Sequence, residues 1–186
     1  MKRAVDIAGA LAGLVLGSPV LLFLAVAVPL ESKGPALHWS RRIGRNNVEF
    51  RMPKFRTMRV GAPNVATHLL ADPDLWITPL GRFLRRTSLD ELPQLWSVLV
   101  GDMSLVGPRP ALFNQDDLVA LRTAGGVHRL RPGLTGWAQI NGRDELPIAQ
   151  KVQLDVEYLR RRSLVFDLKI LAATAWIAVT GRGVSH

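Results

Sequence analysis

The sequence has 186 residues, a formal net charge of +9 and no cysteine. This length suffices for one domain with a hydrophobic core, and the absence of cysteine excludes disulfides, thiolate nucleophiles and thiolate metal sites. Excess positive charge is typical of proteins that bind nucleic acid, anionic lipid or phosphorylated small molecules. Because no nucleic-acid-binding motif is present, we expect lipid and phosphate as partners, and no nucleic acid.

The first predicted element is an apolar helix, since residues 7–30 carry no charged side chain. The run is long enough to cross a hydrocarbon core, and it is too long for a cleaved signal peptide. Basic residues flank both of its ends, namely Lys2 and Arg3 before it and Lys33, Arg41 and Arg42 after it. The positive-inside rule puts both flanks on the cytoplasmic side, and Ser18-Pro19 predicts a kink near the middle. A simple span stays open, but we favour a re-entrant membrane helix over 1–32.

The rest of the chain, 33–186, is predicted to form one domain on the cytoplasmic face. Residues 35–50 are expected to be extended, 50–58 to form a strand, and 60–75 to form a loop around a short helix. Two short helices are predicted over 80–86 and 88–100, the second closed by Gly101.

The second half of the chain alternates rigid loops and helices. Loops rich in glycine and proline are predicted over 101–110 and 131–143, and helices over 112–123 and 147–162. The apolar segment 163–180 fits an interfacial amphipathic helix or a buried core helix about equally well. The expected fold is therefore a single α/β domain, mostly helical, with a re-entrant helix, interfacial helices and a small sheet at most.

The adjacent carboxylates Asp90 and Glu91 are the most informative polar feature. Several arginines lie near them in the sequence, at Arg82, Arg85, Arg86 and Arg109. Guanidinium groups bind phosphate oxygens in pairs, and a carboxylate beside a phosphate can act as nucleophile, base or magnesium ligand. The spacing of Ser88 and Glu91 also fits a capping box with no chemical role. Spacing alone leaves both interpretations open.

Five motifs, taken together, closely resemble the bacterial sugar transferase family, the monotopic phosphoglycosyl transferases. They are Lys54-Phe55-Arg56-Thr57-Met58, Phe83-Leu84-Arg85 with Ser88-Leu89-Asp90-Glu91-Leu92-Pro93-Gln94-Leu95, the segment 101–110 with Gly107-Pro108-Arg109-Pro110, the segment 131–143, and Asp167-Leu168-Lys169-Ile170. The resemblance runs from Lys2 to about Ile170, and all five motifs occur in the order that the family has.

The resemblance implies transfer of a phosphosugar from a UDP-sugar to a membrane polyprenol phosphate, with release of UMP. It implies a covalent intermediate on Asp90 and a magnesium ion held by Asp90 and Glu91. It also implies a re-entrant helix kinked at Ser18-Pro19, and a location at the cytoplasmic face of the bacterial inner membrane. The chain resembles the short form of the family, which is essentially the catalytic module.

Six basic residues are our candidates for phosphate or uridine contacts: Lys54, Arg56, Arg85, Arg109, Arg131 and Arg143. Arg109 is favoured because Pro108 and Pro110 stiffen its backbone. We expect the arginines and a helix N-terminus to keep Asp90 ionised. The expected partners are a UDP-sugar, polyprenol phosphate and anionic membrane lipid, with monomer or homodimer left open.

Two other functions compete with the transferase. A hydrolase could cleave a nucleotide-sugar diphosphate with water, and a basic membrane adaptor would use the carboxylates only as a helix cap. Neither the transferred sugar nor the pathway follows from the sequence.

Overall fold

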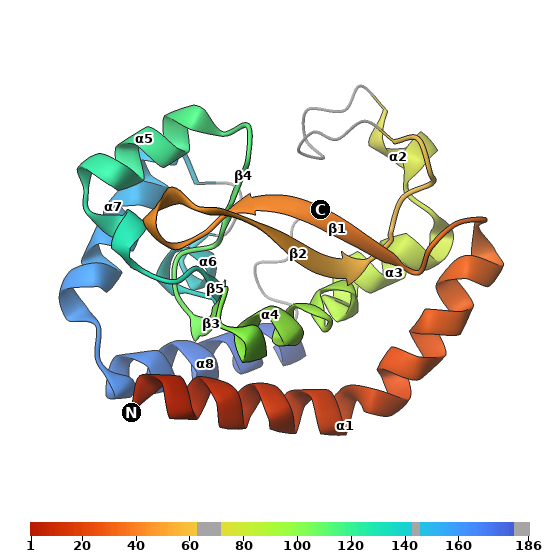
Figure 1. Ribbon diagram of the computed structural model, residues 1–186, viewed down its shortest axis with the longest axis horizontal. Helices are drawn as coiled ribbons and strands as arrows, with labels where there is room; N and C mark the ends of the chain where they lie inside the picture. Colours follow the sequence, from red (N-terminus) through yellow and green to blue (C-terminus); the bar gives the residue numbers. More distant parts are fainter. Residues whose placement is uncertain (63–71, 143–145, 181–186) are drawn as a thin grey trace.

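The computed structural model describes residues 1–62, 72–142 and 146–180 (Figure 1). Its α-helices are α1 (Lys2–Glu31), α2 (Pro73–Trp76), α3 (Pro79–Thr87), α4 (Gln94–Val100), α5 (Asp116–Ala124), α6 (Trp137–Ile140), α7 (Ile148–Arg161) and α8 (Leu164–Thr180). Short 3₁₀ turns are η1 (Arg45–Asn47), η3 (Leu89–Glu91) and η4 (Val127–Arg129). The strands are β1 (Leu37–Ile43), β2 (Glu49–Phe55), β3 (Ser104–Val106), β4 (Ala111–Leu112) and β5 (Gly133–Thr135). The predicted fold, mostly helical with little sheet, is confirmed.

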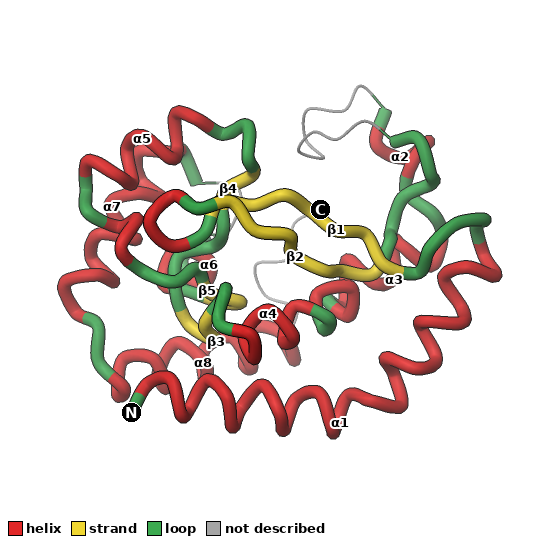
Figure 2. The backbone as a smooth tube through the Cα atoms, viewed as in Figure 1, coloured by secondary structure: helices red, strands yellow, loops and turns green. Residues whose placement is uncertain are grey.

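Two small sheets bring distant motifs together (Figure 2). The first has the order β2-β1-β4 and is antiparallel, with Ile43 of β1 opposite Ala111 of β4. The second pairs β3 and β5 in parallel, with Val106 opposite Thr135. The β4 contact carries the loop 107–110 to the edge of the hairpin, and the β5 contact fixes the start of the same loop.

The apolar N-terminal segment forms one helix, α1, whose axis changes direction along its length (Figure 1). Pro19 has no N–H to donate to the carbonyl of Val15, one turn earlier. The Ser18 hydroxyl donates to that same carbonyl instead, at 2.8 Å. The predicted kink at Ser18-Pro19 therefore has a local cause in which the hydroxyl replaces the missing backbone donor.

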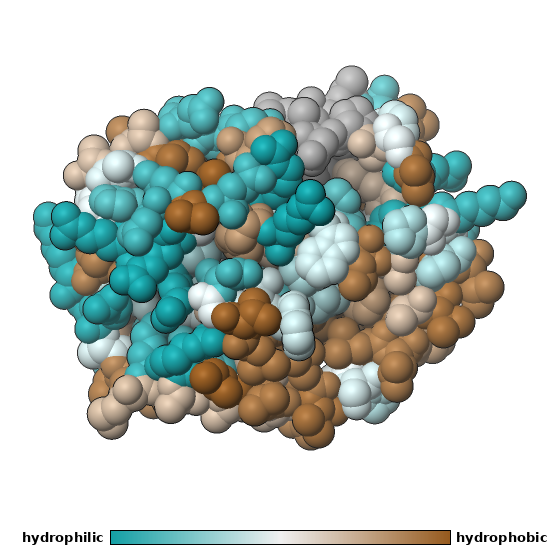
Figure 3. Space-filling view, viewed as in Figure 1, coloured by the Kyte–Doolittle hydropathy of each residue, from teal (hydrophilic) through white to brown (hydrophobic). Residues whose placement is uncertain are grey.

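Most of the α1 surface is apolar and uncovered. Leu16 is 81% exposed and Leu22 is 70% exposed, and apolar side chains gather along the lower edge of the molecule, over α1 (Figure 3). Within the described residues, α1 is the one helix long and apolar enough to cross a membrane. An apolar surface of this extent marks an interaction with lipid or with another protein.

Both ends of α1 are tied to the remainder of the domain. At the N-terminal end, Lys2 forms an ion pair of 2.6 Å with Asp167 of α8, and Arg3 donates to carbonyls in the last turn of α4. At the C-terminal end, Glu31 accepts a hydrogen bond of 2.7 Å from the backbone N–H of Leu80. The two ends of the apolar helix therefore lie against the same folded body.

The core is made where α1, β2 and α4 meet. Ala10 of α1, Met52 of β2 and Val98 of α4 are buried in one cluster. A second cluster joins α7 to α8 through buried Tyr158 and Ile170. Each such apolar side chain contributes about 1.5–3 kcal/mol when fully buried. Because α1 supplies part of the first cluster, it is part of the domain as well as an apolar surface.

The last helix combines the two expectations for residues 163–180. Its predicted range agrees with α8, and one face is buried through Phe166 and Ile170. The other face is exposed, since Val165 is 65% exposed and Trp176 is 64% exposed. The helix therefore packs against the core and keeps an apolar outer face.

One predicted helix is wrong. Residues 88–100 do not form a continuous helix, because Ser88 ends α3 with a left-handed φ of 57°. The turn η3 follows, and α4 begins only at Gln94, after Pro93. The predicted helix 112–123 also starts late, since its first residues belong to β4 and α5 begins at Asp116.

Candidate active site

The carboxylates Asp90 and Glu91 lie on η3, in the short break between α3 and α4. The Ser88 side chain makes no capping hydrogen bond. The Glu91 carboxylate instead accepts two bonds from the guanidinium of Arg109, at 2.7 Å and 3.5 Å. The capping-box interpretation is therefore wrong, and the pair is free of a helix-capping role.

Three cations predicted from the sequence surround Asp90, and they come from different elements. Lys54 lies near the end of β2, Arg85 lies on α3, and Arg109 follows β3; all three act electrostatically on the Asp90 carboxylate. Arg85 also donates to the hydroxyl of Thr57 at 2.9 Å, which fixes its direction. The structure thus gathers two adjacent carboxylates and three cations that are far apart in the sequence.

Burial dominates the electrostatics of Asp90, which is 7% exposed. Burial, followed by the charge of Glu91, raises the pKa of Asp90 to about 6, although Lys54, Arg85 and Arg109 act in the opposite direction. We expected the arginines to keep this group ionised; their charges do oppose the shift, but burial outweighs them and raises the pKa. A carboxylate with a raised pKa is a stronger base, and it is still mainly ionised at neutral pH.

The pKa values of two neighbours of Asp90, Glu91 and Lys54, are both lowered. Burial acts to raise the pKa of Glu91, but the charge and hydrogen bonds of Arg109 hold it below its usual value. Burial, with repulsion from Arg42, lowers the pKa of Lys54 to about 8. The site therefore holds a fixed negative charge at Glu91 and two groups, Asp90 and Lys54, that titrate near neutral pH.

Arg42 belongs to the cluster and was missed as a site residue. Its charge acts on both Lys54 and Glu91. It lies on β1, where His38 pairs with Lys54 across the sheet, and Arg42 is four residues after His38. Side chains four apart on a strand share one face. That alternation over 37–43 could have found Arg42, which we had interpreted only as a membrane flank.

The loop that carries Arg109 is packed backbone to backbone against β5. Gly107 N donates to the Thr135 carbonyl and Gly133 N donates to the Pro108 carbonyl, both at 2.9 Å. A Cβ added at Gly133 would lie 2.1 Å from the Gly107 nitrogen, so glycine is required by space. The loop 107–110 and β5, which belong to two separate sequence motifs, therefore form a single unit.

The other predicted contacts lie elsewhere or are undescribed. The Arg56 guanidinium binds the segment that follows α1, where it donates to Ser32 and to the Pro35 carbonyl at 2.6–2.8 Å. Arg131 is half-buried just before β5, and it is not among the cations that act on Asp90 most strongly. Arg143 lies outside the described residues. A structural role fits Arg56 better than substrate binding.

The acidic groups suit a magnesium ion only in a limited way. Among the residues that the structure describes, no three acidic, histidine or cysteine side chains converge. Magnesium is commonly held by one or two carboxylates, with substrate phosphates and water as further ligands. Asp90 and Glu91 fit that kind of site, because the Glu91 side chain stays 23% exposed although Arg109 binds both of its oxygens.

Comparisons with known proteins identify the family. The family model described as bacterial sugar transferase matches residues 1–181. A UDP-glucose:undecaprenyl-phosphate glucose-1-phosphate transferase of Escherichia coli (strain K12) is 42% identical over 183 residues, which cover 95% of this chain and 39% of that protein. A protein of the same name from Caulobacter vibrioides is also 42% identical, over 93% of this chain and 67% of that protein.

The sugar transferase EpsL of Bacillus subtilis (strain 168) is 39% identical over 186 residues, covering all of this chain and 91% of EpsL. The chain spans 35–39% of the length of the first three curated relatives. With the family model matched along nearly its whole length, this chain belongs to the bacterial sugar transferase family.

Proposed function

We propose that this protein transfers a sugar phosphate from a UDP-sugar to a polyprenol phosphate such as undecaprenyl phosphate, releasing UMP. The observation that carries the proposal is the buried Asp90 carboxylate among Lys54, Arg85 and Arg109. A diphosphate needs cations in this arrangement, and a phosphorus atom held there would meet a nucleophile directly. The printed names of relatives about 40% identical support the same reaction.

In the first step, an Asp90 oxygen attacks the phosphorus that carries the sugar. The bond from that phosphorus to the bridging oxygen breaks, and UMP leaves with the electron pair. In the second step, a phosphate oxygen of the polyprenol phosphate attacks the same phosphorus. The bond to Asp90 breaks, which restores the carboxylate and gives polyprenyl-diphospho-sugar.

The chain's own residues prepare both steps. Lys54, Arg85 and Arg109 offset the charge of the diphosphate, and Arg109 also holds Glu91 in place. A magnesium ion held by Asp90, Glu91 and diphosphate oxygens would reduce the repulsion between the two anions. Two steps at one carboxylate let a water-soluble donor and a lipid acceptor use the same position in turn.

The arrangement of α1 supports a site at the membrane surface. A re-entrant path requires both ends of the helix on one side, and both ends of α1 are bonded to the same domain. The residues after the carboxylate pair approach α1 directly, since a Cβ at Gly17 would lie 3.9 Å from Leu92. We infer that the site faces the cytoplasmic side of a bacterial inner membrane, within reach of a lipid phosphate and anionic headgroups.

Intact mass spectrometry tests the proposal directly. The detergent-solubilised protein is incubated with individual UDP-sugars and Mg²⁺ without lipid, and we expect a mass increase of one phosphosugar with matching UMP. Added polyprenol phosphate must remove the adduct and yield the lipid-linked product. UMP released without any adduct would instead support a hydrolase. Neither adduct nor UMP from any donor, in a sample that binds UMP, would contradict the transferase.

The rate of adduct formation should have a bell-shaped pH dependence. Asp90 must be ionised to attack, so the rate rises as pH passes the Asp90 pKa of about 6. Lys54 must be protonated to offset phosphate charge, so the rate falls as pH passes the Lys54 pKa of about 8. Such limbs report the coupled site as a whole.

Lys54→Arg separates the two limbs. Because arginine keeps its charge at all accessible pH values, the alkaline fall should move above about pH 9 while the acid limb stays in place. Single-turnover rates between pH 5 and 9.5 give both limbs. An alkaline limb that Lys54→Arg leaves unmoved would assign that limb to another group.

A further inference from the structure

A buried ion pair lies behind the Arg109 loop, and the proposed mechanism has not yet used it. Arg122 of α5 is 8% exposed and Asp155 of α7 is 1% exposed. The Arg122 guanidinium binds one Asp155 oxygen twice, with distances of 2.8 Å from Nε and 2.6 Å from Nη2. Removing two charges from water is costly, and such pairs often add little stability compared with apolar side chains. The orientation that such an ion pair gives to its neighbours can matter more than its contribution to the stability of the fold.

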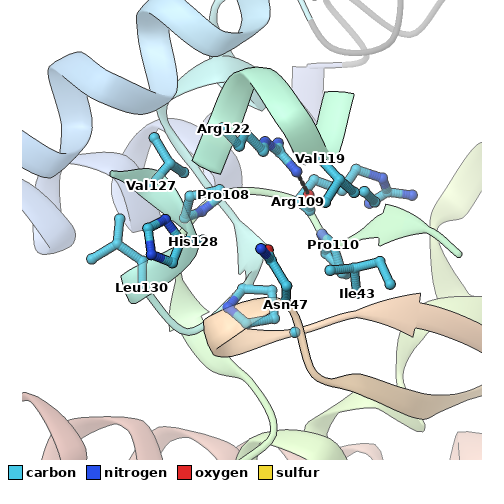
Figure 4. A pocket seen from close by; sticks show the side chains of 13 residues that line it. Ile43, Asn47, Pro108, Arg109, Pro110, Val119, Arg122, Val127, His128 and Leu130 are labelled. Carbon is cyan, nitrogen blue, oxygen red and sulfur yellow. Dashed lines mark hydrogen bonds between the residues drawn. The ribbon is translucent and has the colours of Figure 1, made fainter. Parts of the chain in front are cut away.

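The third nitrogen of Arg122 points to the site. Its Nη1 donates to the backbone carbonyl of Arg109 at 2.8 Å, the bond drawn in Figure 4. The side chain of the same Arg109 binds Glu91 at 2.7 Å. A continuous series of polar contacts therefore runs from Asp155 through Arg122 and Arg109 to Glu91, the neighbour of Asp90.

The Arg109 backbone is held mainly by hydrogen bonds. Three successive carbonyls accept bonds from three separate elements: Pro108 from Gly133 N, Arg109 from Arg122, and Pro110 from Arg42. The prolines on either side fix φ at their own positions. With each peptide fixed in this way, the direction in which Arg109 leaves the backbone is fixed too.

Packing alone does not fix the Arg109 loop on the side that faces Arg122 and His128. A small cavity of about 30 Å³ lies there, lined by Pro108, Arg109, Pro110, Arg122 and His128 among others (Figure 4). A cavity of this volume has space for about two water molecules. A loop backed by a cavity can shift where close-packed side chains would prevent it. The Arg122 hydrogen bond therefore carries the restraint on this side.

We propose that Arg122, oriented by Asp155, is a positioning residue that holds Arg109 against Glu91 and toward the phosphate-binding position beside Asp90. This inference rests on the proposed transferase function. Arg122 does not touch substrate; it acts through the Arg109 carbonyl. Loss of the hydrogen bond from Arg122 to the Arg109 carbonyl would let the loop move into the cavity. The Arg109 guanidinium would then move away from Glu91. Displacements of about 1 Å in such groups can slow a reaction by about 100-fold.

The test measures single-turnover adduct formation, which reports two separate quantities. The amplitude gives the fraction of folded, competent protein, and the rate constant gives the chemistry. For Arg122→Met we expect a rate about ten- to 100-fold lower, with an amplitude near that of the wild type. Arg122→Lys, which can still donate to the carbonyl, should recover part of the rate. Arg41→Met, which breaks the exposed Arg41–Glu49 pair, serves as the matched control with unchanged rate.

A double-mutant cycle of Arg122 and Arg109 tests whether Arg122 acts through Arg109. If Arg122 acts through Arg109, adding Arg122→Met to Arg109→Met should change the rate by less than about twofold. Independent, multiplicative losses would overturn the proposal, as would a lower amplitude at unchanged rate for Arg122→Met. If Arg122→Met does not fold, Arg122→Met/Asp155→Leu removes both charges together and must show the slow rate with full amplitude. Failure of the proposed function is distinguishable, since the wild type would then form no adduct.

Discussion

Asp90→Asn will lower adduct formation and turnover at least about 1,000-fold, because an amide is not a nucleophile toward phosphorus at neutral pH. The substitution keeps the size and shape of the side chain, so the site stays assembled. UMP binding should survive, since Lys54, Arg85 and Arg109 remain in place. Single-turnover mass spectrometry and UMP titration measure the two effects separately. A normal rate of adduct formation in Asp90→Asn would assign the nucleophile elsewhere.

The same substitution will make the fold more stable. The folded pKa of Asp90 is about 6, above the ordinary value of 3.8. As pH rises between these values the unfolded state loses its proton first, so stability falls and stays lower at pH 7. At about 1.4 kcal/mol for each unit, the ionised group costs the fold up to about 3 kcal/mol. An amide avoids this cost.

We therefore expect Asp90→Asn to raise the melting temperature at pH 7 by several degrees, about 2–4 °C for each kcal/mol. The gain should shrink as pH falls below about 6 and vanish below about pH 3, where Asp90 is protonated in both the folded and the unfolded protein. Asp74→Asn, at a carboxylate whose side chain is 85% exposed, is the matched control and should change little. A destabilised Asp90→Asn would mean that the ionised carboxylate is well compensated where it stands.

Gly133→Ala is expected to cause the largest structural loss. The added methyl would lie 2.1 Å from the Gly107 nitrogen and 2.4 Å from the Thr135 carbonyl oxygen. Both are backbone atoms, so no side chain can turn aside to make room. The loop carrying Arg109 would separate from β5, and we expect a loss of more than about 3 kcal/mol and no measurable adduct.

The control for this substitution is Gly17→Ala, where an added methyl would meet only the Leu92 side chain at 3.9 Å. That variant should purify and react like the wild type. Yield of monodisperse protein, melting temperature and adduct amplitude compare the two. Wild-type values for all three in Gly133→Ala would contradict the close packing of the two loops.

Local patterns predicted the parts of this site that depend on short segments. The carboxylate pair and its neighbouring arginines suggested chemistry on a phosphorylated substrate, and the family resemblance pointed to Asp90. Lys54 and Arg85 do act on that carboxylate. Arg56 belongs to the same motif as Lys54, yet its guanidinium turns to Ser32. A motif match cannot tell which of two nearby basic residues faces the site.

What the sequence could not predict depends on contacts between distant elements. The raised pKa of Asp90 follows from burial under several elements, whereas the sequence shows only the neighbouring charges. Arg122 and Asp155 carry no local signal, because their pairing requires α5 and α7 to meet. The helix expected over 88–100 failed at Ser88, where a left-handed conformation in a residue other than glycine has no sequence marker.

Because α1 is bonded to the domain at both ends, the exposed apolar helix cannot be separated from the rest of the fold. Ala10 shares a buried cluster with Met52, Leu95 and Val98, and Arg3 binds the last carbonyls of α4. Deleting residues 1–31 would remove one layer of the fold and uncover apolar surface on β2 and α4. Water solubility and an assembled site are therefore not independent properties of this molecule. One face of α1 is apolar and exposed, at Leu16 and Leu22, while another supplies buried Ala10 to the core, so a single helix serves both surroundings.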